Sequence, residues 1–339
     1  MLYLQNKKKY KMNITTNQII ALQQIEGCGL KTIKAFADYA STEYQKQIIS
    51  NEELWVFVNE CIENKVAPRC KLSKLSLDEI DSAVYTANKI LEKSNDLGIK
   101  AISYLDDSYP KCLLDTIDEE GKSSIPIILY YKGDINIAKL PGIAIIGTRE
   151  PTPEGIKAGT YLGKIFAEAG FNIVSGLAVG CDTSGHKGAL LCEGGKTTSF
   201  LAHGLDSVYP EENKGLADEI IAKGGLLMSE YPIGTRVNRY NLVARDRLQA
   251  ALSKATIVIQ TGERGGTNHA ANTTLKANKP LFCVKYANES LMSNERVRGN
   301  ILLVQKGAKY ISSKDALEVV KSSLNEKINI RPIIEGNLF

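Results

Sequence analysis

A threonine and an arginine stand directly after a short apolar run, where a predicted strand passes into a predicted helix. The run at 143–146 is apolar and β-branched, which is typical of a strand buried on both faces. Thr148 and Arg149 follow it, and Thr152 and Pro153 then suit the cap and the first position of a helix. A hydroxyl, a guanidinium and free helix amides suit a phosphate. An ordinary turn, with Arg149 in a surface ion pair, explains the same residues equally well.

A glycine-rich loop after the next predicted strand offers a second phosphate cradle. Its glycines allow close approach of the backbone, its amides can form a nest of donors, and its serine adds a hydroxyl. The residues expected to contact phosphate there are Ser175, Gly176, Leu177 and Gly180.

Two polar residues begin the helix after this loop. Asp182 can cap that helix, and His186 lies one turn further on. The glycine spacing departs from Gly-x-Gly-x-x-Gly, and no acidic residue ends the strand to bind a ribose. A dinucleotide is therefore disfavoured, and we expect no cofactor.

More cationic and glycine residues follow later strands. Lys214 adds positive charge at the rim of the expected site, although a solvated lysine is the ordinary interpretation. A basic strip is expected from four arginines, for which scattered surface positions are the alternative: Arg236, Arg239, Arg245 and Arg247. A further anion cradle is expected at Gly265, Gly266 and Thr267.

Alternating strands and helices must position these loops. We expect strands at 143–146, 172–174, 197–201, 226–228, 256–259 and 281–284. We expect helices at 156–169, 184–193, 213–223, 239–251, 268–278 and 316–324. This alternation predicts an α/β fold with a doubly wound, mostly parallel sheet. Because such sheets bind ligands beyond the carboxyl ends of their strands, the loops should converge on one phosphate-bearing ligand.

The region before this sheet is predicted to be a small all-helical domain. Apolar residues flank the turn at Gly27 and Gly29, a pattern similar to a helix-hairpin-helix, which holds nucleic-acid phosphates without reading sequence. A helical hairpin that only packs is at least as good an explanation. Two more strands are expected at 98–104 and 125–133. The expected division of the chain is a disordered basic arm at 1–12, a helical domain at 13–95, a Rossmann-like domain at 96–320 and a tail at 321–339.

Composition and missing motifs limit the function. The net charge of +4 permits a polyanionic partner without requiring one. The seven cysteines form no Cys-x-x-Cys pair, which indicates reduced thiols in the cytoplasm rather than disulfides or zinc. No apolar run could span a bilayer, so no membrane partner is expected. Without a P-loop lysine, a nucleophile elbow or a metal-ligand cluster, the pattern favours a binding protein over an enzyme.

The ordered motifs together resemble the DNA-processing protein family called DprA or Smf. The resemblance rests on residues 143–149 with 151–155, 174–182 with His186, 204–210 with Asn213, 229–235, and 298–300 with 307–308. It covers residues 98–311, and the helical region before them is similar to the family's N-terminal domain.

This resemblance implies an extended Rossmann-like domain, related to the LOG-type nucleotide-binding superfamily, that binds single-stranded DNA. In bacteria that take up DNA, the family protects incoming strands and helps to load the recombinase RecA, usually as a homodimer. The winged-helix domain that many members carry at the C-terminus is not expected in this chain. By position, the residues that would contact phosphate or sugar are Thr148, Arg149, Ser175, Gly176 and Lys214, with Asp182 and His186 shaping the pocket.

Three departures from the family pattern leave other functions open. Asp246 stands in Arg245-Asp246-Arg247 where asparagine is usual, Gln260-Thr261 replaces an acidic end, and Gly265-Gly266-Thr267 replaces Ser-Gly-Ser or Ser-Gly-Thr. The last loop also resembles that of nucleoside-monophosphate phosphoribohydrolases, for which Glu230 or Glu263 would supply the acid. A sensor of a small nucleotide, used in defence against foreign DNA, is a further alternative.

Overall fold

The computed structural model describes residues 13–324, which divide into two compact units. The first unit holds residues up to 109 together with 127–130, and the second holds 110–126 and the residues from 131 onward. The expected arm at 1–12 and most of the expected tail, from 325 onward, lie outside the described residues. The proposed domain boundary between residues 95 and 96 stays a prediction.

Four helices make up most of the first unit: α1 (Thr16–Gln23), α2 (Leu30–Thr42), α3 (Asn51–Glu63) and α4 (Leu77–Asp96). Three of them begin at a capping box, in which the hydroxyl of Thr15, Ser50 or Ser76 accepts a hydrogen bond from an amide three residues later. The glycine turn lies between α1 and α2, with Gly27 at φ +80°. Strand β1 (Lys100–Ser103) follows, and β2 (Ile128–Gly133) begins in this unit and ends in the second.

Seven strands of the second unit form a parallel sheet. They are β3 (Gly142–Ile146), β4 (Asn172–Ser175), β5 (Lys196–Leu201), β6 (Leu226–Ser229), β7 (Ser253–Val258), β8 (Leu281–Val284) and β9 (Lys309–Ile311). Their order across the sheet is β6-β5-β4-β3-β7-β8-β9, and every neighbouring pair is parallel. The predicted doubly wound α/β class is confirmed.

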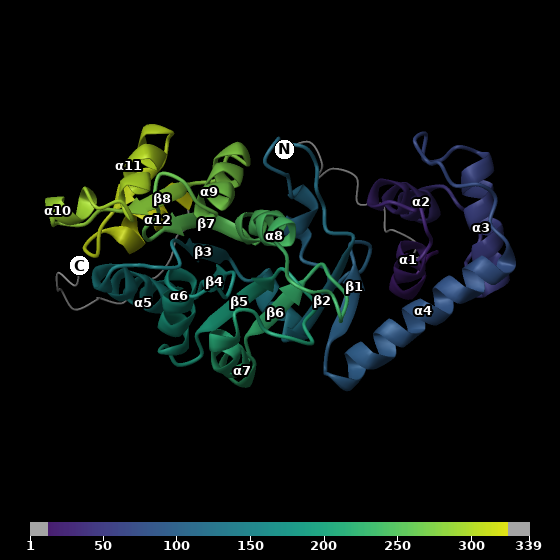
Figure 1. Cartoon of the computed structure of the whole chain (residues 1–339), viewed down its shortest axis with the longest axis horizontal. Coiled ribbons are helices and arrows are strands. Elements are labelled where there is room, and N and C mark those ends of the chain that lie inside the picture. Colours follow the sequence, from purple (N-terminus) through teal and green to yellow (C-terminus); the bar gives the residue numbers. More distant parts are fainter. Residues whose placement is uncertain (1–12, 325–339) are drawn as a thin grey trace. The chain divides into compact units, whose positions relative to one another are not determined.

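Helices cover both faces of this sheet, as the apolar strands require. Ile143 and Ile145 of β3 pack with α5 (Pro153–Glu168), α6 (Cys181–Leu190) and α12 (Ala316–Leu324) on one face. Ala144 and Ile146 pack on the other face with α9 (Thr267–Lys276) and α11 (Arg298–Gln305). Figure 1 shows α5 and α6 on one side of the sheet and α9 and α11 on the other. The remaining helices of the unit are α7 (Lys214–Ala222), α8 (Arg239–Leu252) and α10 (Glu289–Met292), with 3-10 turns at Lys111–Asp115, Ile135–Lys139 and Glu211–Asn213.

The direction of winding reverses beside β3. From β3 the chain adds β4, β5 and β6 on one side, and then returns to place β7, β8 and β9 on the other. The crevice beyond the carboxyl ends of β3 and β7 is therefore the place where such sheets bind their ligands.

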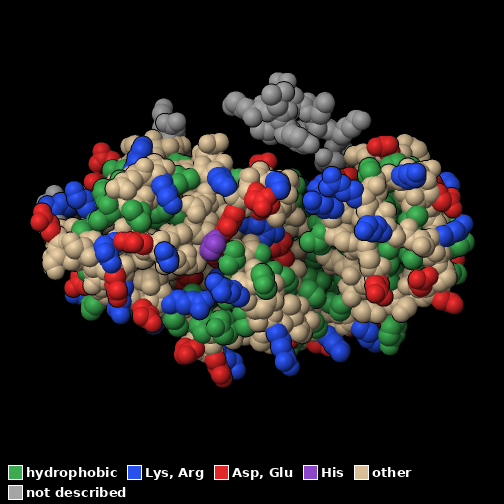
Figure 2. Space-filling view, turned by 45° about the horizontal axis from the view of Figure 1, so that its top comes forward, with side chains coloured by type: hydrophobic (Ala, Val, Ile, Leu, Met, Phe, Trp, Pro, Cys, Tyr) green, Lys and Arg blue, Asp and Glu red, His purple; other side chains and the backbone are tan. Residues whose placement is uncertain are grey.

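Charges of both signs are mixed on the face of the molecule that Figure 2 shows. Figure 2 shows Lys and Arg side chains interspersed with Asp and Glu on the visible face, instead of one continuous basic area. On this face, attraction for an anion must therefore come from a few particular residues and backbone amides.

Candidate functional site

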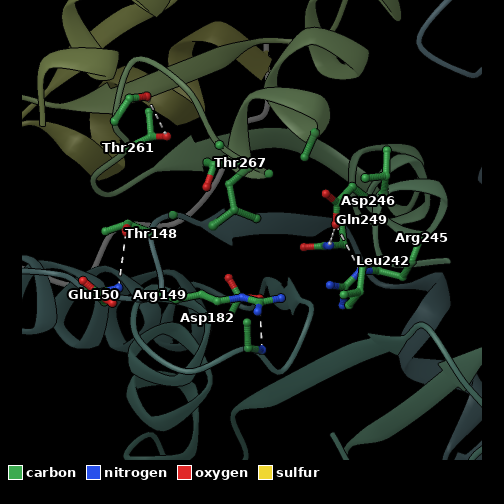
Figure 3. Close-up of a pocket in the computed structure, with 18 of the residues that line it drawn as sticks. Thr148, Arg149, Glu150, Asp182, Leu242, Arg245, Asp246, Gln249, Thr261 and Thr267 are labelled. Carbon is green, nitrogen blue, oxygen red and sulfur yellow. Dashed lines mark hydrogen bonds and ion pairs between the residues drawn. The ribbon is translucent and has the colours of Figure 1, made fainter. Parts of the chain in front are cut away.

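An open pocket of about 370 Å³ lies at the carboxyl ends of β3 and β7. Four segments line it: the loop after β3, the loop after β4, helix α8 and the loop after β7 (Figure 3). The structure thus brings together residues that are far apart in the sequence. The predicted site residues that line the pocket are Thr148, Arg149, Asp182, Arg245, Gly265, Gly266 and Thr267.

The loop after β3 is held in place by a residue from the end of β7. Thr152 caps α5, with Pro153 at the first turn, as predicted. The backbone oxygen of Gln260 accepts from the amide of Thr148 at 2.7 Å, and its fully buried side chain bonds Thr152. Arg149 remains exposed at the pocket, and within residues 13–324 it has no ion-pair partner. The alternative of a surface ion pair for Arg149 is therefore wrong for the described chain.

The loop after β4 is built around Asp182. Its Oδ2 accepts hydrogen bonds from the amides of Gly176, at 3.1 Å, and Ala178, at 3.3 Å. Asp182 is 6% exposed, and burial raises the pKa of its carboxyl, opposed chiefly by the nearby Arg245. It lies inside α6 and shapes the loop instead of capping the helix, because Gly180 occupies the cap position.

Several predicted phosphate contacts in this loop are not accessible. Ser175 is fully buried and its hydroxyl donates to the backbone oxygen of Ile145 at 2.6 Å. Gly176 is buried with its amide already used by Asp182, and Leu177 is fully buried. These residues support the loop from below, so the expected direct contacts must be corrected.

Gly180 joins the two loops. Its φ is +87°, and a Cβ there would lie 2.6 Å from the backbone oxygens of Thr148 and Arg149. Only glycine fits this close approach without movement. Gly180 therefore acts through the backbone geometry of the pocket wall.

His186 lies beneath the pocket and does not line it. The side chain is fully buried, with Nδ1 2.6 Å from the hydroxyl of Thr197, which itself donates to the backbone oxygen of Ile173. Nδ1 therefore carries the proton of a neutral imidazole. Burial, helped by Arg245, lowers the pKa of His186 to about 3.

The predicted basic strip is divided by the fold. Arg245 is 5% exposed and its guanidinium donates to the backbone oxygens of Gly176, at 2.6 Å, and Phe200. Arg247 forms two hydrogen bonds with Glu230, at 2.7 and 2.6 Å, with little exposure of either side chain. Only Arg236 and Arg239 are exposed. The strip fails because two of its guanidiniums bond with the protein interior.

The loop after β7 presents backbone donors to the pocket. Gly265 and Gly266 are exposed, and Thr267 begins α9. Among the described residues, no group accepts a hydrogen bond from the amides of Gly266 and Thr267. Arg264 also lines this part of the pocket and is exposed. The predicted anion site is thus present: the amides at the start of α9 lie at the same pocket as Arg149 and Arg264.

The motif at residues 298–300 supports this loop from behind. Asn300 is fully buried, and its side chain accepts from the amide of Thr261 at 3.0 Å and donates to the backbone oxygen of Ile259 at 2.9 Å. A Cβ on Gly299 would lie 2.2 Å from the backbone oxygen of Gly262. The motif therefore has a structural role in positioning the cradle.

Lys214 stands outside the pocket at the start of α7. The preceding residue, Asn213, donates to the backbone oxygen of Leu177 at 2.8 Å, which fixes the start of α7 against the loop after β4. Lys214 is exposed and is not among the lining residues. It can serve only a ligand that extends beyond the pocket.

Apart from Arg245, the residues of α8 that line the pocket were not predicted from the sequence. Leu242, Asp246 and Gln249 all line the pocket. Their spacing of four and three residues places them on one face of a helix, and this was the signal that could have found them. Thr261 also lines the pocket and was not among the predicted site residues.

Residues 13–324 hold neither a membrane-spanning helix nor a metal-binding cluster of side chains. No helix there has the length and apolar character needed to cross a membrane. No three side chains of His, Cys, Asp or Glu gather there as a metal site.

Comparisons with known proteins agree with the fold and motifs. A sequence model of the family described as "DNA recombination-mediator protein A" matches residues 100–321. The chain is 32% identical over 243 residues to the DNA processing protein DprA of Bacillus subtilis, covering 71% of this chain and 78% of that protein. It is 28% identical over 305 residues to the protein Smf of Synechocystis, covering 88% and 70%.

Two solved structures are similar as well. The DNA processing protein A of Streptococcus pneumoniae matches with a TM-score of 0.67 and 26% identity over 90% of this chain and 98% of that one. The DNA processing protein A of Helicobacter pylori, described for its single-stranded DNA binding mode, matches with a TM-score of 0.56 and 28% identity over 66% and 96%. With its sheet, pocket and ordered motifs, this chain belongs to the DNA recombination-mediator protein A family.

Proposed function

We propose that this protein binds single-stranded DNA and holds its sugar–phosphate backbone across the carboxyl ends of β3 and β7. One observation carries the proposal: within residues 13–324, Arg149 is exposed without an ion pair, at a pocket where the amides of Gly266 and Thr267 have no acceptor in the same range. A guanidinium and a helix start are strong partners for phosphate. The relative from Helicobacter pylori is described as binding single-stranded DNA.

The accessible cations define a revised set of phosphate contacts. Arg149 and Arg264 stand at the pocket, and Lys214 lies outside it at the start of α7, which Asn213 fixes against the loop after β4. Arg245 and Arg247 support the structure because their guanidiniums bond with protein oxygens. The proposed interface is thus a short line of exposed charges and amides.

The protein acts in this proposal as a binder within DNA recombination, not as an enzyme. Its family is described as a recombination mediator. From the family resemblance, we further propose a homodimer that protects single strands and delivers them to RecA. The phosphoribohydrolase alternative would need Glu230 or Glu263, and neither residue lines the pocket. Glu230 is paired with Arg247, and Oε1 of Glu263 lies 3.7 Å from Nε of Arg298.

The test is a titration of a labelled single-stranded oligonucleotide at two salt concentrations. Phosphate binding releases counterions, so the affinity should fall steeply as salt rises. Arg149→Ala should weaken binding about 10-fold, the order expected for one charged contact. Lys164→Ala is the matched control, because Lys164 lies in the second half of α5, away from its pocket-facing start, and carries the same charge. Equal affinity of the two variants would overturn the proposal.

The same preparation separates the alternatives. Release of free base from nucleoside monophosphates would identify a phosphoribohydrolase. Thermal stabilisation by a mononucleotide without any oligonucleotide binding would identify a sensor of a small nucleotide.

A further inference from the structure

The wall of the pocket that α8 supplies presents oxygen atoms where the opposite rim presents cations and amides. Asp246 lines the pocket with 14% of its side chain exposed. Its Oδ1 accepts two hydrogen bonds, from Nε of Arg245 at 3.1 Å and from Nε2 of Gln249 at 3.0 Å. Its Oδ2 has no hydrogen-bond partner among residues 13–324. One carboxylate oxygen is thus anchored, and the other is left for a ligand.

Gln249 holds this carboxylate in a fixed orientation. Its amide must turn its nitrogen toward Asp246, because the reversed amide would place two oxygens against each other. Gln249 is 2% exposed, and its Oε1 is buried without a partner. Buried acceptors of this kind are rare in proteins and need an explanation. This wall therefore holds two acceptor oxygens, Oδ2 of Asp246 and Oε1 of Gln249, that receive no hydrogen bond from residues 13–324.

A phosphate cannot occupy this wall. Burial is the main cause that raises the pKa of Asp246, with Arg245 opposing it and Asp182 adding to it, and an anion placed against Oδ2 of Asp246 would meet an acceptor with no donor between them. The phosphate must stay at the rim with Arg149 and the loop after β7. The part of a nucleotide that reaches α8 must be a group that donates hydrogen bonds.

Among the parts of a DNA strand, only the bases supply such donors. Cytosine, adenine and guanine each present an exocyclic amine, whereas thymine presents a single N–H between two carbonyl oxygens that a carboxylate would repel. The pocket volume of about 370 Å³ is within the range for small ligands, and Leu242, Val243 and Ala270 supply apolar contacts for a ring.

We propose that Asp246, oriented by Gln249 and Arg245, receives the amino group of a base of the bound strand, so that the pocket favours bases with an exocyclic amine over thymine. This inference rests on the proposed binding of single-stranded DNA. The backbone contacts supply most of the affinity, and the single base in the pocket adds a preference to it.

The test compares fluorescent dC and dT oligonucleotides of equal length with the full chain at pH 8. These two bases are both pyrimidines, so the comparison minimises differences in stacking. The wild-type protein should bind the dC strand at least about 10-fold more tightly, as expected for one hydrogen bond to a charged group. Asp246→Asn should bring the two dissociation constants to within 2-fold, because an amide can also donate to the carbonyl oxygens of thymine.

Glu150→Gln is the charge-matched control. Glu150 also lines the pocket, but it stands at the exposed rim, and its side chain is 80% exposed. Removing its charge should tighten the binding of both strands by the same factor and leave their ratio unchanged. A ratio that moves equally in both variants would show a general charge effect and overturn the inference.

The remaining outcomes separate this inference from the function on which it rests. If the folded wild-type protein binds neither strand, the proposed function fails. If it binds both equally, and Asp246→Asn leaves the ratio unchanged, only the role of Asp246 fails. If thermal melting shows that Asp246→Asn does not fold, Asp246→Ser removes the same carboxylate and should abolish the same preference.

Discussion

Gln260 and Thr152, which are 108 residues apart in the chain, are joined by two hydrogen bonds. The side-chain oxygen of Gln260 accepts from the amide of Thr152 at 2.9 Å, and its nitrogen donates to the hydroxyl of Thr152 at 2.9 Å. The end of β7 is thereby fastened to the start of α5, across the point where the winding of the sheet reverses. At this strand end a neutral amide satisfies both a donor and an acceptor.

Gln260→Leu should lower the free energy of unfolding by about 2–4 kcal/mol, because it leaves the buried amide of Thr152 without a partner. Urea denaturation measures this change. Gln305→Leu, at an exposed position of α11, is the control and should change stability by less than about 0.5 kcal/mol. Equal stability of the two variants would contradict the role given to Gln260.

Gly180→Ala should both destabilise the protein and weaken DNA binding. The new Cβ would lie 2.6 Å from two backbone oxygens, at a φ of +87°. Strain of this kind costs about 1–3 kcal/mol, and it pushes the loop of Arg149 out of place. Gly215→Ala in α7 is the control, since nothing lies within 4 Å of its Cβ position. Thermal melting and oligonucleotide titration of both variants check the prediction, which fails if Gly180→Ala binds DNA as the wild-type protein does.

Lys214→Ala should weaken the binding of a long oligonucleotide and leave that of a very short one unchanged. The reason is that Lys214 is exposed at the start of α7 and does not line the pocket. With the long strand, the slope of log affinity against log salt should fall by about 0.7, as expected for one lost phosphate contact on a single strand. Lys223→Ala, near the end of the same helix and paired with Glu219, is the control. A loss that is the same for both strand lengths would place Lys214 at the pocket instead.

His186 should make the protein less stable in acid. Its pKa is lowered from 6.5 to about 3, so below pH 6.5 the unfolded chain takes up a proton that the folded protein does not. The free energy of unfolding therefore falls, as far as this group is concerned, by about 1.4 kcal/mol per pH unit between pH 6.5 and 3. Asp246 acts in the opposite direction, because burial raises its pKa to about 6 and the folded state binds its proton first.

Comparing the wild-type protein with His186→Leu isolates the histidine, since both proteins keep Asp246. Between pH 7 and pH 5 the stability of the variant should improve relative to the wild-type protein by about 2 kcal/mol. Urea denaturation at both pH values measures the difference. Parallel stability curves for the two proteins would show that His186 is protonated as easily in the folded state as in the unfolded state.

Local sequence patterns predicted most of the sheet and its helices. The last helix was expected at 316–324 and is found at Ala316–Leu324, and Thr152 caps α5 as expected. These features depend on the periodicity of buried residues and on side chains that bond amides three residues away. Both signals lie within a short stretch of sequence, so they can be predicted from it. Strand β9 and helix α11 were missed, because β9 has only three residues and α11 follows directly on a polar loop.

The sequence by itself determined that phosphate-friendly loops follow the strands of a parallel sheet, because strand and helix periodicity places those loops at one edge. Only the tertiary structure decided which of their side chains are free. Arg245 bonds a backbone oxygen 69 residues away and Arg247 bonds Ser124, 123 residues away, so both guanidiniums are occupied. Arg149 meets no such partner in the described chain and stays open. A hydrogen bond between distant residues leaves no local pattern, because it depends on the folded path of the whole chain.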